Sequence, residues 1–410
     1  SRTPPERSQN TTIDNSSIES LTTLKRLDLS YTYADDESLR HLANLKSLEE
    51  LDLSATWMTD DGLAHLSGLT NLRTINLGNT RVSDAGLVHL QGLTRLRHLE
   101  LSNTMVSGTG FKHLASWSAL EHLNLDRQSG STRWPGRIDQ SGITDAGLRV
   151  ISRLPNLRVL ELNDFSDSGS RLTDAGFTHL RNAQNLESLD LYGVRITDAG
   201  LAHLSGMSSL KFLSLYGTQT TDHGLQHVRN LSSLEQIRLN ERQKTNAGLR
   251  NLADLTELKE LYLSTWEQDE THITDDGLQH LARLTKLQRL DLSNTSIDGT
   301  GLVHLSNLAS LEQLNLSDTQ VTDAALQHLQ GLESLTELDL GDTGISDAGL
   351  ELLSRMNQLR SLDLHGTGIT AEGVKYLERM RFLQHLDLSP SLLQLVGDKL
   401  KKALPETEID

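Results

Sequence analysis

A period of 24 residues runs through most of this sequence. Repeats that match L-x-x-L-x-x-L-x-L-x-x-T-x-I-T-D-A-G-L-x-H-L begin at Leu21, Leu45, Leu69, Leu93, Trp117, Leu154, Ala183, Met207, Leu231, Leu255, Leu284, Leu308, Leu332, Met356 and Met380. Most complete repeats have 24 residues, while those that begin at Trp117, Leu154 and Leu255 have 37, 29 and 29. Because each repeat packs only on its neighbours, 410 residues can fold without one deep core.

Each repeat predicts a short strand followed by a short helix. In the second repeat, apolar and polar residues alternate from Leu48 to Leu53, so we expect Leu51 and Leu53 to point inward and Asp52 to point outward. The next residues, Thr59 and Asp60, are typical of the start of a helix. Stacked repeats of this kind place their strands side by side in one parallel sheet.

This pattern resembles the leucine-rich-repeat proteins. Its I-T-D-A-G-L-x-H-L half is similar to the cysteine-containing subclass known from F-box substrate receptors, with threonine where that subclass has cysteine. The resemblance implies an α/β solenoid, or horseshoe, with a parallel β-sheet on the concave face and short helices on the convex face. We expect residues 1–20 to be a polar linker or partial cap without an F-box, 21–390 to be the repeat array, and 391–410 to be a C-terminal cap.

The amino-acid composition limits which cellular compartments and which classes of partner fit this chain. The chain has no cysteine, which excludes disulfide-capped ends and favours a bacterial protein, secreted or extracellular rather than cytoplasmic. No apolar run is long enough to predict insertion into a membrane. A net charge of −17 disfavours nucleic acid as the partner, because polyanions would be repelled. We expect a monomer.

Catalytic signatures are missing from the sequence. It contains no phosphate-binding loop that ends in Gly-Lys-Ser/Thr, no His-Glu-x-x-His, no Gly-x-Ser-x-Gly and no cysteine nucleophile. We therefore predict a protein that is not an enzyme and needs no cofactor.

A histidine recurs at one helix position of ten repeats. A metal ladder or a pH sensor is one hypothesis, and packing between adjacent helices is the other. Val150, Asn251, Leu352 and Tyr376 occupy the same position elsewhere, and apolar side chains cannot bind a metal. We favour packing and predict no metal site. The ten histidines are His41, His65, His89, His113, His179, His203, His227, His280, His304 and His328.

A second column of polar residues falls in the middle of the predicted strands and is mostly acidic. This acidic column consists of Asp28, Asp52, Asn76, Glu100, Asn124, Glu161, Asp190, Ser214, Arg238, Tyr262, Asp291, Asn315, Asp339, Asp363 and Asp387. Neighbouring carboxylates repel one another. Either solvent and nearby hydroxyl groups offset this repulsion, or the carboxylates are kept because they attract a basic partner. The column is interrupted by Ser214, Arg238 and Tyr262, with Tyr192, Phe212 and Tyr216 beside them. Aromatic and arginine side chains on a solvated sheet face are typical of protein interfaces.

The three length insertions all fall between a strand and the following helix. They are residues 126–142, about 163–171 and about 264–272, and they contain Arg127, Arg133, Trp134, Phe165 and Trp266. Gly108-Thr109-Gly110 and Gly299-Thr300-Gly301 replace Asp-Ala-Gly on either side of this irregular block. Neutral drift explains extra loop length, but it does not explain tryptophan and arginine in polar loops, so we favour a functional role.

Together these features predict a scaffold that binds a protein partner, one with a basic patch if the acidic column takes part. The predicted contact residues are Arg127, Arg133, Trp134, Phe165, Tyr192, Phe212, Tyr216, Arg238, Tyr262 and Trp266. The alternative is a secreted bacterial effector or a substrate-receptor module of the ubiquitin-ligase type, and an enzyme is the third possibility.

Overall fold

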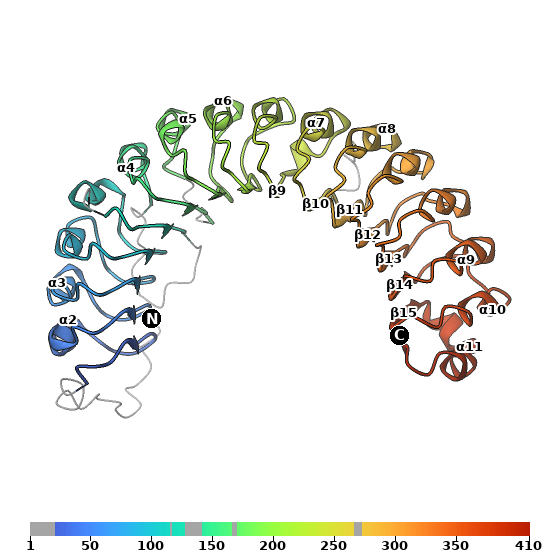
Figure 1. Cartoon of the computed structure of the whole chain (residues 1–410), viewed down its shortest axis with the longest axis horizontal. Helices are drawn as coiled ribbons and strands as arrows, with labels where there is room; N and C mark the ends of the chain where they lie inside the picture. Colours follow the sequence, from blue (N-terminus) through green and yellow to red (C-terminus); the bar gives the residue numbers. More distant parts are fainter. Residues whose placement is uncertain (1–20, 115–116, 128–141, 166–169, 266–272) are drawn as a thin grey trace, which may run out of the picture. The chain divides into compact units, whose positions relative to one another are not determined.

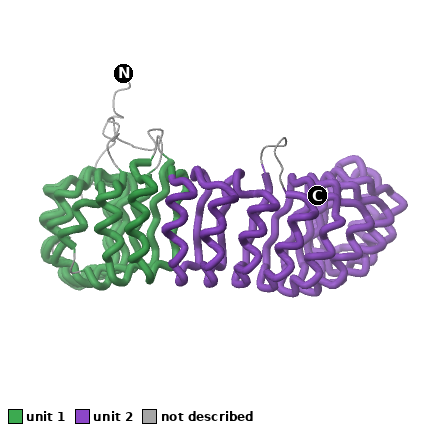
Figure 2. The backbone as a smooth tube through the Cα atoms, turned by 90° about the horizontal axis from the view of Figure 1, so that it is seen from above, with its two compact units in different colours: residues 1–195 green, residues 196–410 purple. Residues whose placement is uncertain are grey.

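The computed structural model describes residues 21–114, 117–127, 142–165, 170–265 and 273–410. The chain divides into two compact units, residues 1–195 and residues 196–410, which Figure 2 shows in green and purple. In each unit the strands lie along one side and the helices along the other (Figure 1). The predicted α/β repeat fold with parallel strands is confirmed.

The strands of the first unit pair in parallel and in chain order. The register places Leu51 opposite Ile75 and Asp28 opposite Asp52, so equivalent residues of successive repeats face one another. The strands are β1 (Arg26–Asp28), β2 (Glu50–Asp52), β3 (Thr74–Asn76), β4 (His98–Glu100), β5 (His122–Asn124), β6 (Val159–Glu161) and β7 (Ser188–Asp190).

Short helical turns follow these strands on the other side of the first unit. Thr59 begins one of them as predicted, because its side chain accepts a hydrogen bond from the N–H of Asp61. The helices are α2 (Asp36–Leu39), α3 (Asp60–Ala64), α4 (Asp145–Ile151) and α5 (Asp174–Phe177), and the 3₁₀ turns are η1 (Arg40–Asn44), η2 (Gly86–Leu90), η3 (Thr109–Leu114) and η4 (Leu180–Asn182).

The second unit continues the same pattern. Its strands are β8 (Phe212–Ser214), β9 (Gln236–Arg238), β10 (Glu260–Tyr262), β11 (Arg289–Asp291), β12 (Gln313–Asn315), β13 (Glu337–Asp339), β14 (Ser361–Leu364), β15 (His385–Leu388) and β16 (Glu408–Ile409). Its α-helices are α6 (Asp198–Leu201), α7 (Asn246–Leu252), α8 (Asp275–Leu278), α9 (Asp347–Leu353), α10 (Val374–Leu377) and α11 (Pro390–Ala403). Its 3₁₀ turns are η5 (Ala202–Leu204), η6 (Gly224–His227), η7 (Glu241–Gln243), η8 (Gln279–Leu281), η9 (Thr300–Leu305) and η10 (Asp323–His328).

The core is built from leucines that recur in every repeat. Leu51 and Leu53 are buried as predicted, and Asp52 is only half-buried. Among the described residues, a threonine that closes the turn after the strand is also buried in seven of the repeats. Thr56, for example, donates its hydroxyl hydrogen to the carbonyl of Leu53 at 2.6 Å. This bond satisfies a buried polar group, so the threonine fits an apolar position.

The aspartate of the T-D-A-G segment connects neighbouring repeats. Asp198 accepts hydrogen bonds from the N–H and the hydroxyl of Thr221 in the next repeat, both at 2.7 Å. This close approach also explains the glycine of the same segment. A Cβ added to Gly224 would lie 2.2 Å from Asp198 Oδ1. Glycine is therefore needed there because of contact between repeats.

One of the two Gly-Thr-Gly segments is matched by a change in the repeat that follows. Gly299 stands where other repeats have the bridging aspartate, and Ala325 stands where the next repeat would have glycine. A Cβ added to Gly299 would lie 2.4 Å from the Cβ of Ala325, and the φ of Gly299 is +97°. Glycine at position 299 leaves room for the methyl group of Ala325. This contact explains why the Gly-Thr-Gly segment and Ala325 occur together.

The last helix and strand of the second unit pack against the repeats before them. Helix α11 buries Leu392, Val396 and Leu400, which are four residues apart on one face, and β16 pairs with β15. The proposal that residues 391–410 act as a cap rests on this packing. Within the described residues, no helix is long and apolar enough to cross a membrane.

Candidate functional site

Three of the predicted contact residues lie outside the described residues, namely Arg133, Trp134 and Trp266. The other seven are described, and they fall into two groups, one in each unit. We define the strand face of a unit as the side formed by the first and third residues of its strands, opposite the leucine core.

In the first unit, Arg127, Phe165 and Tyr192 lie close together. The Phe165 and Tyr192 rings stack with their centroids 4.3 Å apart, and the N–H of Phe165 donates to the carbonyl of Arg127 at 2.8 Å. The Arg127 guanidinium is itself buried and lies 3.3 Å from a carboxylate oxygen of Asp164. Arg127 therefore supports the loop, while Phe165, with 42% of its surface exposed, is available for contact.

In the second unit, Phe212 and Arg238 come together across β8 and β9. The Arg238 guanidinium carbon lies 5.3 Å from the centre of the Phe212 ring, within the range of a cation–π interaction. Ser214, two residues after Phe212, is fully buried, and its hydroxyl has no hydrogen-bond partner among the described residues. Tyr216 follows the strand and is half-buried.

Tyr262 ends β10 and is the most exposed of the predicted aromatics in the second unit. It keeps 41% of its surface exposed, and its hydroxyl donates to Glu260 Oε2 at 3.2 Å. Burial of the hydroxyl and the nearby Glu260 carboxylate raise the pKa of Tyr262, so the phenol stays protonated and can donate. The Arg289 guanidinium holds the other oxygen of Glu260 at 2.5 Å.

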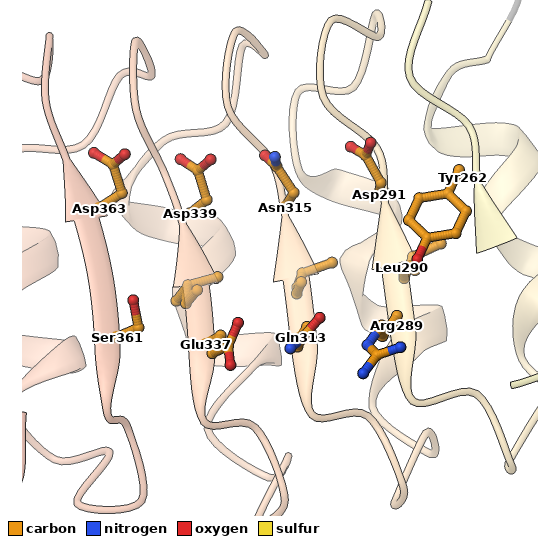
Figure 3. A pocket seen from close by; sticks show the side chains of 12 residues that line it. Tyr262, Arg289, Leu290, Asp291, Gln313, Asn315, Glu337, Asp339, Ser361 and Asp363 are labelled. Carbon is orange, nitrogen blue, oxygen red and sulfur yellow. The ribbon is translucent and has the colours of Figure 1, made fainter. Parts of the chain in front are cut away.

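A hollow of about 370 Å³ begins at Tyr262 and extends over β11 to β14. Figure 3 shows Asp291, Asn315, Asp339 and Asp363 in one row along its wall. A second row is formed by Arg289, Gln313, Glu337 and Ser361. The hollow is open to solvent and most of the side chains that line it are polar, so it suits an extended polar partner better than a buried apolar ligand.

The acidic column has a structural role that the sequence analysis did not identify. In most repeats its side chain accepts a hydrogen bond from the N–H two residues later, as Asp52 does from Ser54 at 2.8 Å. The residue after that turn has a positive φ, for example +54° at Ala55. Asparagine makes the same bond at Asn76, and its side-chain amide also donates to Asp52 at 3.0 Å. The column therefore closes most of the strands, and interleaved asparagines reduce the repulsion.

A cluster of titratable side chains on the strand face of the first unit was also missed. His122 Nε2 lies 3.3 Å from Glu161 and 3.9 Å from Glu100. The nearby Glu161 carboxylate raises the pKa of His122, and burial raises the pKa of Glu100. Burial likewise raises the pKa of Asp126 to about 7. The sequence carries a signal for this cluster. His98 and His122 are the first residues of β4 and β5, and the acidic column supplies the third residue of each strand, so these side chains point to the same face of the sheet.

We expect this cluster to make the first unit less stable as the pH rises. Asp126 has a folded-state pKa of about 7, above its ordinary 3.8, so the folded state holds a proton that the unfolded state releases. The free energy of unfolding therefore falls as the pH rises from the ordinary pKa of Asp126 to its folded-state pKa. The raised pKa of His122 acts in the same direction, because its protonated form is lost as the pH passes the folded-state pKa.

Denaturant titrations at about pH 5 and about pH 8 test this prediction. Asp126→Ser introduces the residue that occupies the equivalent position in other repeats, such as Ser54 and Ser102. The native chain is expected to lose more stability over this interval than the variant. An equal loss in both proteins would assign the pH dependence to other groups.

A pair of exposed aromatics near the start of the first unit was missed as well. Tyr33 and Trp57 occupy equivalent positions in successive repeats, and their ring centroids lie 6.5 Å apart. Both are exposed. Their position directly after the turn threonines Thr32 and Thr56 is the sequence signal that would have identified them.

The recurring histidines lie on the helix side, and eight of the ten are half-buried, while His113 and His304 are exposed. Asn251, which takes this position in one repeat, shows what a polar side chain does there. It accepts from Arg229 Nε and donates to the carbonyl of Asp222, both at 2.9 Å. Contact between adjacent repeats is therefore shown at this position for Asn251, and packing stays the prediction for the histidines.

Replacing His203 and His227 with asparagine is expected to change the melting temperature little, because Asn251 occupies the equivalent position in another repeat. Added zinc is expected to leave the melting temperature of the native chain unchanged. Differential scanning fluorimetry with and without zinc checks both statements. A zinc-dependent rise that the double variant abolishes would establish a histidine metal site.

One group in the described residues has the composition of a metal site, namely Asp363, His365 and Asp387, whose ligand atoms lie within 4.8 Å of one another. Both ring nitrogens of His365 are engaged. Nδ1 lies 2.7 Å from Asp363, and Nε2 lies 2.9 Å from Asp342. The carboxylates raise the pKa of His365, so the ring bridges two acidic residues as a cation at mildly acidic pH.

Comparison with solved structures shows the fold. An internalin of Listeria monocytogenes aligns at 22% identity and a TM-score of 0.53, over 91% of this chain and 88% of the internalin. A leucine-rich-repeat protein of Leptospira interrogans aligns at 19% identity and a TM-score of 0.64, over 96% of this chain and 98% of the other. TLR13, in a complex with the RNA ssRNA13, aligns at 18% identity and a TM-score of 0.63, over 96% of this chain and 58% of TLR13.

Comparison with family models identifies the repeats. No curated protein matches the sequence. A leucine-rich repeat region model matches residues 144–386, and a leucine-rich repeat model matches residues 44–67. Because the first match spans more than half of the chain, the protein belongs to the leucine-rich-repeat family.

Proposed function

We propose that this protein is a non-catalytic scaffold that binds a protein partner through the strand face of its second unit. The observation that carries the proposal is Tyr262, which stays 41% exposed on a sheet face where it has no core to fill. Phe212, Tyr216 and Arg238 stand on the neighbouring strands β8 and β9 or directly after them. Exposed tyrosine and arginine are the residues that most often anchor protein interfaces.

The fold supports the same class of function. Leucine-rich-repeat proteins are generally interaction scaffolds, and the structural neighbours include an internalin and a receptor in complex with an RNA. For this chain we favour a protein over a nucleic acid, because its net charge is −17 and the hollow beside Tyr262 is lined by carboxylates.

Phe165 and Tyr192 offer a second contact of the same kind in the first unit. Their stacked rings form an apolar surface next to the loop that the buried Arg127 supports. Contacts through Arg133, Trp134 and Trp266 stay predictions, as do a monomeric state, a bacterial secreted origin and the alternatives of an effector or substrate-receptor role.

A capture experiment with two variants tests the proposal. The chain is immobilised, partners are captured from the extracts and surfaces of its source organism, and dissociation constants are measured for the captured proteins. Tyr262→Ala is expected to weaken binding by about tenfold, because truncation of an interface anchor costs more than about 1 kcal/mol. The change removes an exposed side chain, so folding is expected to be unaffected.

Val303→Ala is the matched control. Val303 is exposed to a similar extent, 44%, but it lies in η9 on the helix side of the same unit. Binding by this variant is expected to equal that of the native chain. Equal affinity of Tyr262→Ala and Val303→Ala for every captured protein would exclude the strand face of the second unit as the binding surface.

A further inference from the structure

The strand face of β11 to β15 brings carboxylates into direct opposition. The register places Asp339 opposite Asp363 and Asp363 opposite Asp387. Like charges directly opposite in a sheet are destabilising. Burial raises the pKa of Asp339, and the nearby Asp363 carboxylate raises it further. The ionised form of Asp339 therefore has a cost in the folded chain.

The fold does not require these charges. Asp339 accepts the N–H of Gly341 at 2.9 Å, and Asp291 accepts the N–H of Ser293 at 3.0 Å. Asn315, which lies between them in the sheet, accepts the N–H of Ser317 at 2.8 Å. An asparagine thus closes the strand equally well without adding a negative charge. The carboxylates at these positions need an explanation beyond the turn.

Lysine and arginine side chains of the described residues do not neutralise the carboxylates of this face. No lysine or arginine of the described chain forms an ion pair with Asp291, Asp339, Asp363 or Asp387. Arg289 is held by Glu260, and His365 is shared between Asp363 and Asp342. The face keeps an excess of negative charge over a hollow that is open to solvent.

We propose that this face of the second unit docks an extended, lysine- and arginine-bearing segment of the protein partner. The inference rests on the proposed function and adds the chemistry of the partner. The segment's cations lie along Asp291, Asp339 and Asp363, where they offset the repulsion between carboxylates. The Tyr262 ring stands at one end of this row (Figure 3), where a cationic side chain can pack on its face.

A labelled peptide of alternating lysine and glycine is the probe, and a serine–glycine peptide of equal length is the neutral control. Binding to the full chain is measured by fluorescence anisotropy at two salt concentrations. Saturable binding of the lysine peptide, weakened by salt, is expected, with none for the serine peptide. Absence of saturable binding at low salt would overturn the proposal.

The double variant Asp291→Asn, Asp339→Asn tests the location. It is expected to weaken binding by about tenfold or more and to reduce the salt dependence. Its fold is expected to persist, because asparagine makes the same turn bond at Asn315. The matched control is Asp28→Asn, Asp52→Asn, which removes two opposed carboxylates from the same column of the first unit. Equal weakening by both pairs would show a general attraction to an acidic chain and overturn the assignment.

The two proposals fail in different ways. If a captured partner is lost by Tyr262→Ala but binds the Asp291→Asn, Asp339→Asn variant with native affinity, the proposed function stands and the basic segment is excluded. If the lysine peptide binds as expected but no captured protein distinguishes Tyr262→Ala from Val303→Ala, the acidic face is a cation-binding surface and the aromatic anchor is excluded.

Discussion

Truncation of Leu400 to alanine is expected to lower the free energy of unfolding by about 2 to 5 kcal/mol. Leu400 lies on α11, is fully buried, and belongs with Leu392 and Val396 to the buried face of that helix, which we propose to be a cap. Alanine would leave a cavity there. Because repeats pack only on their neighbours, the loss is expected to begin at this end, so the amides of β15 should lose protection against hydrogen exchange first.

Leu395→Ala is the control on the same helix. Leu395 is 73% exposed, so its truncation is expected to change stability by less than about 0.5 kcal/mol. Denaturant unfolding measures both variants. If Leu400→Ala proved as harmless as Leu395→Ala, residues 391–410 would not act as a cap.

Replacement of Gly224 by alanine is expected to cost about 1 to 3 kcal/mol. The added methyl group would lie 2.2 Å from Asp198 Oδ1. That oxygen cannot move away easily, because the carboxylate accepts two hydrogen bonds from Thr221. Gly206→Ala is the control, since no atom lies within 4 Å of a Cβ at Gly206. Thermal and denaturant unfolding of both variants give the comparison.

A double-mutant cycle separates the clash from other effects of the methyl group. Asp198→Gly combined with Gly224→Ala reproduces the pairing of Gly299 with Ala325 in this chain. The double variant is expected to be more stable than the sum of the two single changes predicts, by roughly 1 kcal/mol. Strict additivity would mean that the contact between Asp198 and Gly224 is not what requires glycine.

Much of the local structure could be predicted because it depends on residues close in the chain. The alternation from Leu48 to Leu53 predicted a strand and the burial of Leu51 and Leu53, and both are confirmed. Thr59 and Asp60 predicted the start of a helix, which is confirmed by α3. Capping and alternation are properties of a few neighbouring residues, so no tertiary information is needed to recognise them.

The candidate contact residues show where prediction from sequence ended. Arg127 and Tyr262 were predicted as equivalent contact residues, yet the structure buries Arg127 against Asp164 and leaves Tyr262 exposed. Exposure depends on the neighbouring repeats, which lie 24 to 37 residues away in the sequence. The same distance explains why the cluster around His122 was missed.

The sequence by itself determined the repeat, the order of strand and helix within it, and the leucines that form the core, because these follow from short-range periodicity. Only the tertiary structure decided which side chains of adjacent repeats touch. That contact makes Gly224 necessary beside Asp198, raises the pKa of Asp126 to about 7, and leaves Asp339 and Asp363 opposed without a lysine or arginine that pairs with them. These properties arise from distances of a few ångströms across strands and helices, which a single repeat does not specify.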